Sequence, residues 1–453
     1  MRDSSASVVI CGAGIAGISA AYHLAVTHGI DGVVLVDERA PLTLTSDKST
    51  ECYRNWWPGP GDAMVSLMNR SIDLLEDLAD ASGNWFNMNR RGYLYATADP
   101  TRLCFLRQAA EESTRLGAGP LRCHPGPIPY RPAHTQGYTA ELSGADLIMD
   151  PALIRKHFPY LSPQTVAVLH ARRCGWLSAQ QLGMYLLGQA RQRGVTFVPA
   201  RVSGVDVEHG RVRSIRLQTG ERIATDRFVN AAGPFLKEIG AMLEVDLPVF
   251  CELHAKVSFR DERQVVPREA PMLIWTDPQT LPWSEEERGL LAQSEPTKSL
   301  LRPLPPGAHL RPEGGPDSTV LLMLWAYHTP PVDPVWPPQF DPHYFEIVLR
   351  GLATMIPGLE PYVHKAPRPV IDGGYYTRTR ENRPLIGPLP VGGAYVIGAL
   401  SGFGVMAACA AGELLAAYLT NRALPAYAPA FALERYQSPE YQRLLESWDD
   451  GQI

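Results

Sequence analysis

The first forty residues alternate between short apolar runs and a longer amphipathic stretch. Residues 7–11 (SVVIC) are rich in β-branched side chains, and residues 32–36 (GVVLV) form a second apolar run that leads into Asp37 and Glu38. Between the two runs, residues 15–26 place apolar side chains at helical spacing. Strands are read from short β-branched runs and helices from apolar residues three or four positions apart, so the pattern predicts a strand, a helix and a second strand.

The same two periodicities predict further elements along the chain. Helical spacing occurs at residues 64–81, 179–193, 344–355 and 405–419. Short apolar or alternating runs predict strands at 195–198, 202–207, 212–217, 227–230, 253–259, 320–327 and 394–398. Two stretches rich in proline and glycine, 117–132 and 275–316, show little periodicity and are therefore predicted to be loops or lids. Strands that alternate with helices favour an α/β fold.

Composition narrows the class of protein without changing this picture. A chain of 453 residues is long enough for two or three domains, and its net charge of −5 argues against a nucleic-acid partner. Its seven cysteines contain no CxxC pair, so we expect no metal site and no disulfide framework, and a cytoplasmic location. We expect no secretory signal, and no membrane span because glycines interrupt the uncharged stretch 4–22.

A glycine-rich motif lies between the first predicted strand and helix. Gly12, Gly14 and Gly17 form the pattern GxGxxG, and Asp37 follows Gly17 by 20 residues (37 − 17) at the end of the second strand. In a dinucleotide-binding unit these glycines allow a tight turn, a close approach of backbone amides to a pyrophosphate and close packing of helix on strand. The acid accepts hydrogen bonds from ribose hydroxyls, and Glu38 is the alternative for that role. The motif predicts a dinucleotide but does not separate FAD from NAD.

Longer segments carry a resemblance to a known family of proteins. The sequence resembles the D-amino-acid oxidase-like superfamily of FAD-dependent oxidoreductases, which includes sarcosine oxidase, glycine oxidase and dimethylglycine dehydrogenase. The resemblance is carried, in the order and approximate spacing of that family, by VVICGAGIAGISAAYHLA, LTSDKSTECYRNWWPGPG, RFVNAAGPF, YYTRTRENRPLIGPLP and AYVIGALSGFGVMAACAAGELLA.

The resemblance implies a discontinuous, Rossmann-like FAD-binding domain and a second domain with a largely antiparallel β-sheet that covers the flavin ring. We expect the FAD-binding domain at 1–90, 151–245 and 366–453, and the substrate domain at 91–150 and 246–365. The cofactor-binding residues implied by the resemblance and the glycine motif are Gly12, Gly14, Ile15, Ala16, Gly17, Asp37, Glu38, Ser46, Ser49, Thr50, Val202, Ala232, Gly233, Gly402, Phe403, Gly404, Val405 and Met406.

One of these segments also has a physical interpretation of its own. The turn SGFG precedes a predicted helix, and amides at a helix N-terminus can stabilise negative charge on a reduced flavin. A simple tight turn between a strand and a helix would explain the same glycines.

Departures from the family pattern change the expected chemistry. Glu51 lies near the position of a histidine that dimethylglycine dehydrogenases bond to flavin, and Gly374 lies at the position of the flavin-linked cysteine of sarcosine oxidases. We therefore expect non-covalent FAD. Asn55 and Met406 stand where sarcosine oxidases hold the substrate carboxylate with arginine and lysine, and residues 321–329 lack the lysine credited with oxygen activation.

Candidate catalytic residues follow from the chemistry of amine oxidation. Aromatic side chains suit an apolar or cationic amine, and a guanidinium matches a carboxylate with two parallel donors. A positive group near the ring favours hydride acceptance. The candidates are Trp57 and Tyr376 as pocket walls, His254, Lys256 and His328 as groups that tune the pocket, and Arg54 as carboxylate anchor with Arg378 as a second possibility. Each of these aromatic and basic residues also has an ordinary structural role open to it.

The leading hypothesis is an FAD-dependent oxidoreductase that oxidises a C–N bond of a secondary or tertiary amine or amino acid by hydride transfer. O2 or another electron acceptor would reoxidise the flavin. The alternatives are an FAD-dependent 2-hydroxy-acid dehydrogenase and a non-catalytic flavin-binding subunit.

Overall fold

The computed structural model describes residues 3–57, 59–126, 129–134, 136–139 and 142–448. A six-stranded sheet forms the centre of one half of the molecule, and all its neighbouring strands are parallel except the last pair, β21 and β20. In spatial order its strands are β10 (Thr196–Pro199), β3 (Val33–Asp37), β2 (Val8–Cys11), β14 (Phe228–Asn230), β21 (Ala394–Gly398) and β20 (Leu385–Pro388).

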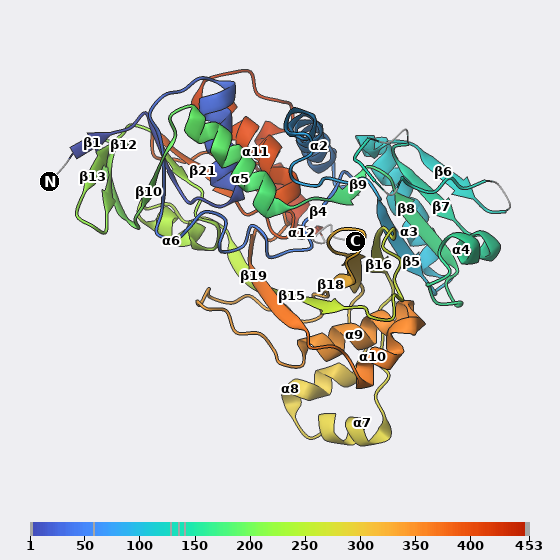
Figure 1. The fold of residues 1–453 in the computed structure, drawn as a ribbon. Coiled ribbons are helices and arrows are strands. Elements are labelled where there is room, and N and C mark those ends of the chain that lie inside the picture. Colours follow the sequence, from blue (N-terminus) through green and yellow to red (C-terminus); the bar gives the residue numbers. More distant parts are fainter. Residues whose placement is uncertain (1–2, 58, 127–128, 135, 140–141, 449–453) are drawn as a thin grey trace.

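Both faces of this sheet are buried, as the short, continuously apolar strands require. Val8 and Ile10 point into a core formed with helices, whereas Val9 and Cys11 point into a core formed with a second sheet. The helices are α1 (Ile15–Tyr22), α2 (Ala63–Ser82), α5 (Ala179–Gln192) and α11 (Gly404–Leu419). The second sheet contains β1 (Asp3–Ser5), β13 (Arg222–Ala224), β12 (Arg211–Leu217) and β11 (Val202–Glu208). Figure 1 shows α1, α5 and α11 packed together on the helical side.

A nine-stranded sheet forms the other half of the molecule. Six of its eight neighbouring pairs are antiparallel, and the pairs β16–β5 and β6–β7 are parallel, so the predicted combination of an α/β cofactor domain with a largely antiparallel second sheet is confirmed. In spatial order the strands are β19 (Val370–Arg378), β15 (Phe250–Arg260), β18 (Val320–Leu324), β17 (His309–Pro312), β16 (Met272–Trp275), β5 (Tyr93–Thr97), β8 (Ala167–Ala171), β7 (Ala145–Ile148) and β6 (Leu121–His124).

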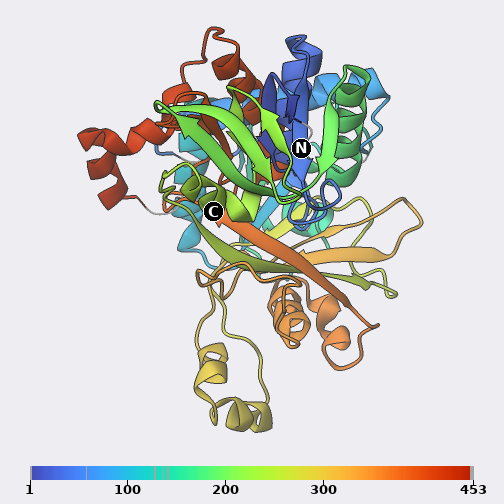
Figure 2. The same cartoon turned by 90° about the vertical axis from the view of Figure 1, so that its left-hand side faces the viewer.

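Smaller elements connect and cover the two large sheets. The short pair β4 (Cys52–Arg54) and β9 (Cys174–Trp176) links the connection between β3 and α2, called the first loop below, to the half of the molecule that holds the nine-stranded sheet. The remaining α-helices are α3 (Arg102–Ser113), α4 (Pro151–His157), α6 (Leu236–Ala241), α7 (Glu285–Leu291), α8 (Glu295–Lys298), α9 (Tyr344–Met355), α10 (Glu360–His364) and α12 (Pro439–Glu446). Figures 1 and 2 show α7 and α8 on an arm that projects below α9 and α10.

The two stretches predicted to be loops contain regular structure, so that prediction was wrong in part. β6 begins at Leu121 within the first stretch, and β17, α7 and α8 lie within the second. Strands of four residues show no detectable periodicity, and β17 exists because β16 and β18 flank it. The helix α7 begins with a capping box. Ser284 Oγ accepts a hydrogen bond from the Glu287 backbone amide, and the Glu287 carboxylate accepts one from the Ser284 backbone amide.

Two predicted elements extend three or more residues beyond the observed elements. The strand predicted at 320–327 ends at Leu324, and the helix predicted at 15–26 changes to a π-helical turn, His23–Thr27, after α1. Strands β8 and β19 lie in the nine-stranded sheet, although their residues fall within ranges that we expected to form the FAD-binding domain.

The packing of α1 against α11 gives a test of this helical layer. A Cβ atom added to Gly412 would lie 2.3 Å from Ser19 Oγ and 2.7 Å from the Ser19 carbonyl carbon, so Gly412→Ala should lower the free energy of unfolding by roughly 1–3 kcal/mol. Gly188 of α5 has open space around its Cα, so Gly188→Ala should instead raise it by up to about 1 kcal/mol. Thermal unfolding midpoints of the two variants would show opposite shifts. Shifts of the same sign would contradict the close approach of α1 and α11.

Candidate cofactor and substrate site

The turn between β2 and α1 needs glycine at two positions for steric reasons. Gly12 has φ +114°, and a Cβ atom there would lie 2.3 Å from the carbonyl oxygen of Ala231. A Cβ atom on Gly17 would lie 2.0 Å from the carbonyl oxygen of Gly12. The first glycine therefore lets β2 approach the chain after β14, and the other lets α1 pack directly on the turn.

The start of α1 presents backbone amides rather than a side-chain cap. Gly14 occupies the N-cap position without a side-chain hydrogen bond, and the amide of Ile15 donates to Ser46 Oγ at 3.0 Å. Amides at a helix N-terminus carry partial positive charge and bind anions such as a pyrophosphate. Ser46 is thus placed at the turn by a direct contact.

Asp37 lies at the end of β3, beside the same turn. Its Oδ2 accepts from the amide of Ala13 at 2.8 Å, and its Oδ1 accepts from the amide of Arg39 at 2.9 Å. Burial raises the pKa of this carboxyl, although the two amide bonds act in the opposite direction. Glu38 is more exposed and forms an ion pair with Arg39 at 3.7 Å. The geometry therefore favours Asp37 over Glu38 as the ribose acceptor.

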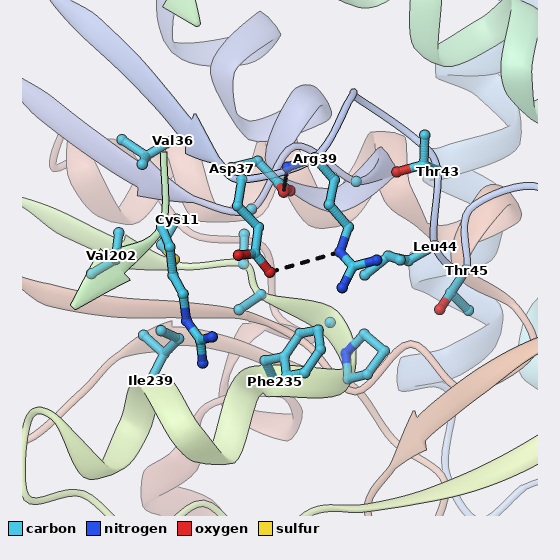
Figure 3. A pocket seen from close by; sticks show the side chains of 18 of the residues that line it. Cys11, Val36, Asp37, Arg39, Thr43, Leu44, Thr45, Val202, Phe235 and Ile239 are labelled. Atoms are coloured by element: carbon cyan, nitrogen blue, oxygen red, sulfur yellow. Dashed lines mark hydrogen bonds and ion pairs between the residues drawn. The ribbon is translucent and has the colours of Figure 1, made fainter. Parts of the chain in front are cut away.

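Three adjoining cavities lead away from this turn, and Figure 3 looks into the first. The first, of about 260 Å³, lies between Asp37, Val202 and the loop at Thr45. The second, of about 100 Å³, shares Gly14 and Ser46 with the first, and the third, of about 420 Å³, shares Ser49, Tyr376, Ser401 and Gly402 with the second. Such an elongated path suits an extended dinucleotide, whose diphosphate would lie at the glycine turn.

The residues that the sequence predicted as cofactor contacts distribute over these cavities. Gly12, Gly14, Asp37, Glu38, Ser46, Val202, Ala232 and Gly233 line the first cavity. Gly14, Ile15, Ala16, Ser46, Ser49, Gly233, Gly402, Gly404 and Val405 line the second. Ser49, Thr50, Gly402, Phe403 and Met406 line the third. Gly17 lines none of the three and serves packing instead.

The turn before α11 closes the second cavity. Ala399 and Ser401 adopt positive φ values, 52° and 46°, and the amide of Ser401 donates to the carbonyl of Thr377 at 2.9 Å. Phe403 occupies the N-cap of α11 without a side-chain hydrogen bond. The first amides of α11 are therefore not capped by the Phe403 side chain, and amides at a helix N-terminus can bind an anionic group.

A buried arginine lies in the third cavity. Arg54 is 8% exposed, its Nη1 donates to Tyr95 Oη at 2.7 Å, and its guanidinium lies 4.4 Å from the ring centre of Trp57. The Trp57 ring makes an edge-to-face contact, 5.2 Å between ring centres, with Phe403 of the turn before α11. Within the described residues, Arg54 forms no ion pair with a carboxylate. A buried guanidinium without a counter-charge is costly and favours an anionic ligand.

A network of charged and aromatic groups forms the opposite wall. On β15, His254 Nε2 lies 3.0 Å from Glu252 Oε2, and the imidazole stacks on Tyr376 of β19 at 4.1 Å with an interplanar angle of 12°. Arg378 Nη1 lies 3.3 Å from the same carboxylate oxygen. Burial lowers the pKa of His254. Burial alone would raise the pKa of Glu252, but His254 and Arg378 lower it overall.

Two predicted residues lie outside the third cavity. Lys256 Nζ donates to the backbone carbonyls of Asp47 and Ser49, so its ammonium holds the first loop. His328 lines a separate cavity between β15 and the arm that carries α7 and α8. Neither residue lines a cavity where the flavin ring or substrate is expected.

Sequence reasoning missed several residues of the third cavity. Glu252 shares a strand face with His254, and that period of two was a usable signal. Arg102, Tyr93, Trp275 and His309 come from elements that only the nine-stranded sheet brings together, so no local pattern indicated them.

The described residues contain neither a membrane-spanning helix nor a metal-binding group of side chains. None of the helices in those ranges is both long and apolar enough to cross a bilayer. In the same ranges, no three His, Cys, Asp or Glu side chains are grouped so that they could hold a metal ion.

Comparisons with known proteins agree with this geometry. Dimethylglycine dehydrogenase from mouse mitochondria is 25% identical over 424 residues, which cover 92% of this chain and 42% of that protein. The chain thus spans less than half the length of this relative. Among solved structures, L-proline dehydrogenase from P. horikoshii has a TM-score of 0.73 at 19% identity, covering 96% of this chain and 99% of that one. Glycine oxidase from Geobacillus kaustophilus has a TM-score of 0.73 at 15% identity, covering 95% and 99%.

A family model gives the remaining comparison. The model described as DAO, FAD dependent oxidoreductase, matches residues 7–418, which include the glycine turn, Asp37, both walls of the third cavity and the turn before α11. The chain belongs to the DAO family of FAD-dependent oxidoreductases, and its cofactor is FAD.

Proposed function

We propose that this enzyme oxidises a C–N bond of a secondary or tertiary amine or amino acid. The observation that carries the proposal is the buried guanidinium of Arg54, which has no carboxylate partner among the described residues. It lies in the third cavity, which is lined by aromatic side chains and adjoins the turn before α11. The names of the similar proteins support the same substrate class, because dimethylglycine, glycine and L-proline each carry a carboxylate beside an amine.

The residues of the third cavity have distinct tasks in this proposal. When bound, FAD accepts a hydride from a carbon next to an amine nitrogen. Arg54 binds the substrate carboxylate through two parallel hydrogen bonds and so orients that carbon. Trp57 and Phe403 exclude water around the guanidinium, which strengthens its charge–charge attraction.

His254 is suited to the proton that the amine must lose. Its lowered pKa keeps the imidazole neutral at pH 7, and donation from Nε2 to the anionic Glu252 leaves Nδ1 as an acceptor. In the oxidation the C–H electron pair leaves as hydride, the nitrogen lone pair forms a C=N bond, and a secondary amine also gives up its N–H proton. Water then adds to the imine and releases a carbonyl compound and a smaller amine.

The FAD assignment to Asp37 can be tested without turnover. Asp37→Asn should weaken FAD binding roughly tenfold, since a neutral amide makes poorer hydrogen bonds to ribose hydroxyls and to Ala13 than a carboxylate does. Glu38→Gln is the matched control and should retain FAD. The ratio of flavin to protein absorbance after gel filtration, and FAD titration of the stripped protein, measure the effect. Equal FAD loss in both variants would remove Asp37 from its assigned role.

The proposed reaction predicts which compounds bleach the flavin. Mixed anaerobically with the holoenzyme, N-methylglycine, N,N-dimethylglycine or L-proline should remove the oxidised-flavin absorbance. Arg54→Met should weaken apparent binding of the responding amino acid by roughly a hundredfold, while an N-methylalkylamine without a carboxylate should respond alike in both proteins. Bleaching by lactate with no response to any amine would transfer the function to 2-hydroxy acids.

The pH dependence of flavin reduction should reveal His254. Because burial places its pKa below the ordinary value of 6.5, the acceptor is present above that pH and is lost as the pH falls through the lowered pKa. The rate constant of anaerobic reduction should therefore decline on the acid side below pH 6.5. His254→Gln should abolish this acid limb. An unchanged acid limb in the variant would exclude His254 as its origin.

A further inference from the structure

The lining of the third cavity contains more arginines than acidic residues. Its lining includes three arginines, Arg54, Arg102 and Arg378, but one acidic residue, Glu252. The two histidines of the lining add no charge at neutral pH, since burial lowers the pKa of His254 and lowers that of His309 to about 4. Glu252 lies within 3.3 Å of Arg378 Nη1 and balances that guanidinium. Within this lining, Arg54 and Arg102 have no acidic partner.

Arg102, the first residue of α3, is one of these two arginines. Its Nε lies 4.0 Å from Asp277 Oδ1, but that carboxylate already accepts hydrogen bonds from Thr97 Oγ1 and from the amides of Ala98 and Asp99. The buried Nε of Arg102 has no hydrogen-bond partner in the part of the chain that the structure describes. The ion pair with Asp277 is therefore a weak one, and donor capacity remains on the guanidinium.

The two guanidiniums lie at different depths. The Arg54 residue is 8% exposed, whereas the Arg102 side chain is 24% exposed and its guanidinium lies 4.7 Å from the ring centre of the exposed Phe105. Arg54 rests in the same manner against Trp57. Each guanidinium is thus held against an aromatic ring, with Arg54 in the more buried position and Arg102 in the more exposed one.

We propose that Arg102 binds a second carboxylate, and that the substrate is a secondary amine with a carboxylate on each of its two arms, an N-carboxyalkyl amino acid. This inference rests on the proposed function. One carboxylate pairs with Arg54 at the closed end, the other pairs with Arg102 near the entrance, and the amine nitrogen lies between them. A dianion offers a carboxylate to each of the two guanidiniums, whereas a mono-anionic amino acid offers only one.

Binding can be measured with ligands that have no C–N bond to oxidise. Diglycolate is an ether with a carboxylate on each arm, and methoxyacetate is the matching ether with a single carboxylate. Each would be titrated into the oxidised holoenzyme while the flavin absorbance spectrum is followed. Diglycolate should bind roughly ten to a hundred times more tightly than methoxyacetate, because it makes one further charged bidentate contact.

Arg102→Met should remove this difference by weakening diglycolate and leaving methoxyacetate unchanged. Arg102→Lys, which keeps the charge but loses the fork, should give an intermediate affinity for diglycolate. Arg115→Met removes the same charge from an exposed position that lines no part of the cavity, and should behave as the unmodified protein. Flavin content and thermal midpoint of each variant establish that the fold is intact.

The outcomes separate this inference from the proposed function. Equal affinities for the two ethers, or a preference for diglycolate that survives Arg102→Met, would overturn the second carboxylate site even if amines reduce the flavin. Selective diglycolate binding that depends on Arg102 supports the site even if every amine fails to bleach the flavin. In the reaction itself, iminodiacetate should show a lower KM than N-methylglycine, and Arg102→Met should raise the KM for iminodiacetate without a comparable fall in kcat.

Discussion

The close approach of Gly12 to the carbonyl of Ala231 is the constraint on which the cofactor site depends. It brings the end of β2 against the chain that leaves β14, and no side chain larger than hydrogen fits at this contact. Because the turn is held there, the amide of Ala13 reaches Asp37 and the amide of Ile15 reaches Ser46. One steric contact therefore positions the amides of the turn, the Asp37 carboxylate and Ser46 together.

The third cavity forms where the two halves of the fold meet, and β15 with β19 forms one of its walls. The antiparallel register pairs Glu252 with Tyr376 and His254 with Gly374, so charged and aromatic side chains from two strands project from one sheet face. The first loop supplies Arg54 and Trp57 across the cavity, and Lys256 holds that loop through backbone carbonyls. Charge in the cavity is thus set by residues far apart in sequence: Arg378 has an acidic partner within the lining, whereas Arg54 and Arg102 do not.

The predictable part of the site is the part formed by local sequence. The glycine turn, Asp37 and the turn before α11 were predicted because each lies at a junction of strand and helix with a recognisable pattern. The strands β6 and β17 and the helix α7 were not, since four- to seven-residue elements within proline-rich stretches show too few periods to detect. Lys256 was predicted near the flavin from its strand, but its side chain length lets it reach the Asp47 carbonyl instead.

The sequence by itself predicted a dinucleotide site and the order of strands and helices around the glycine turn. Those features depend on residue type and on periodicities of two and 3.6, which neighbours in the chain set. Only the tertiary structure decided which side chains share the third cavity, because one sheet joins β5, β15, β16 and β19 from segments spread over residues 93–378. Whether a given arginine is neutralised depends on distances between such segments, so the surplus of positive charge could not be seen before the chain was folded.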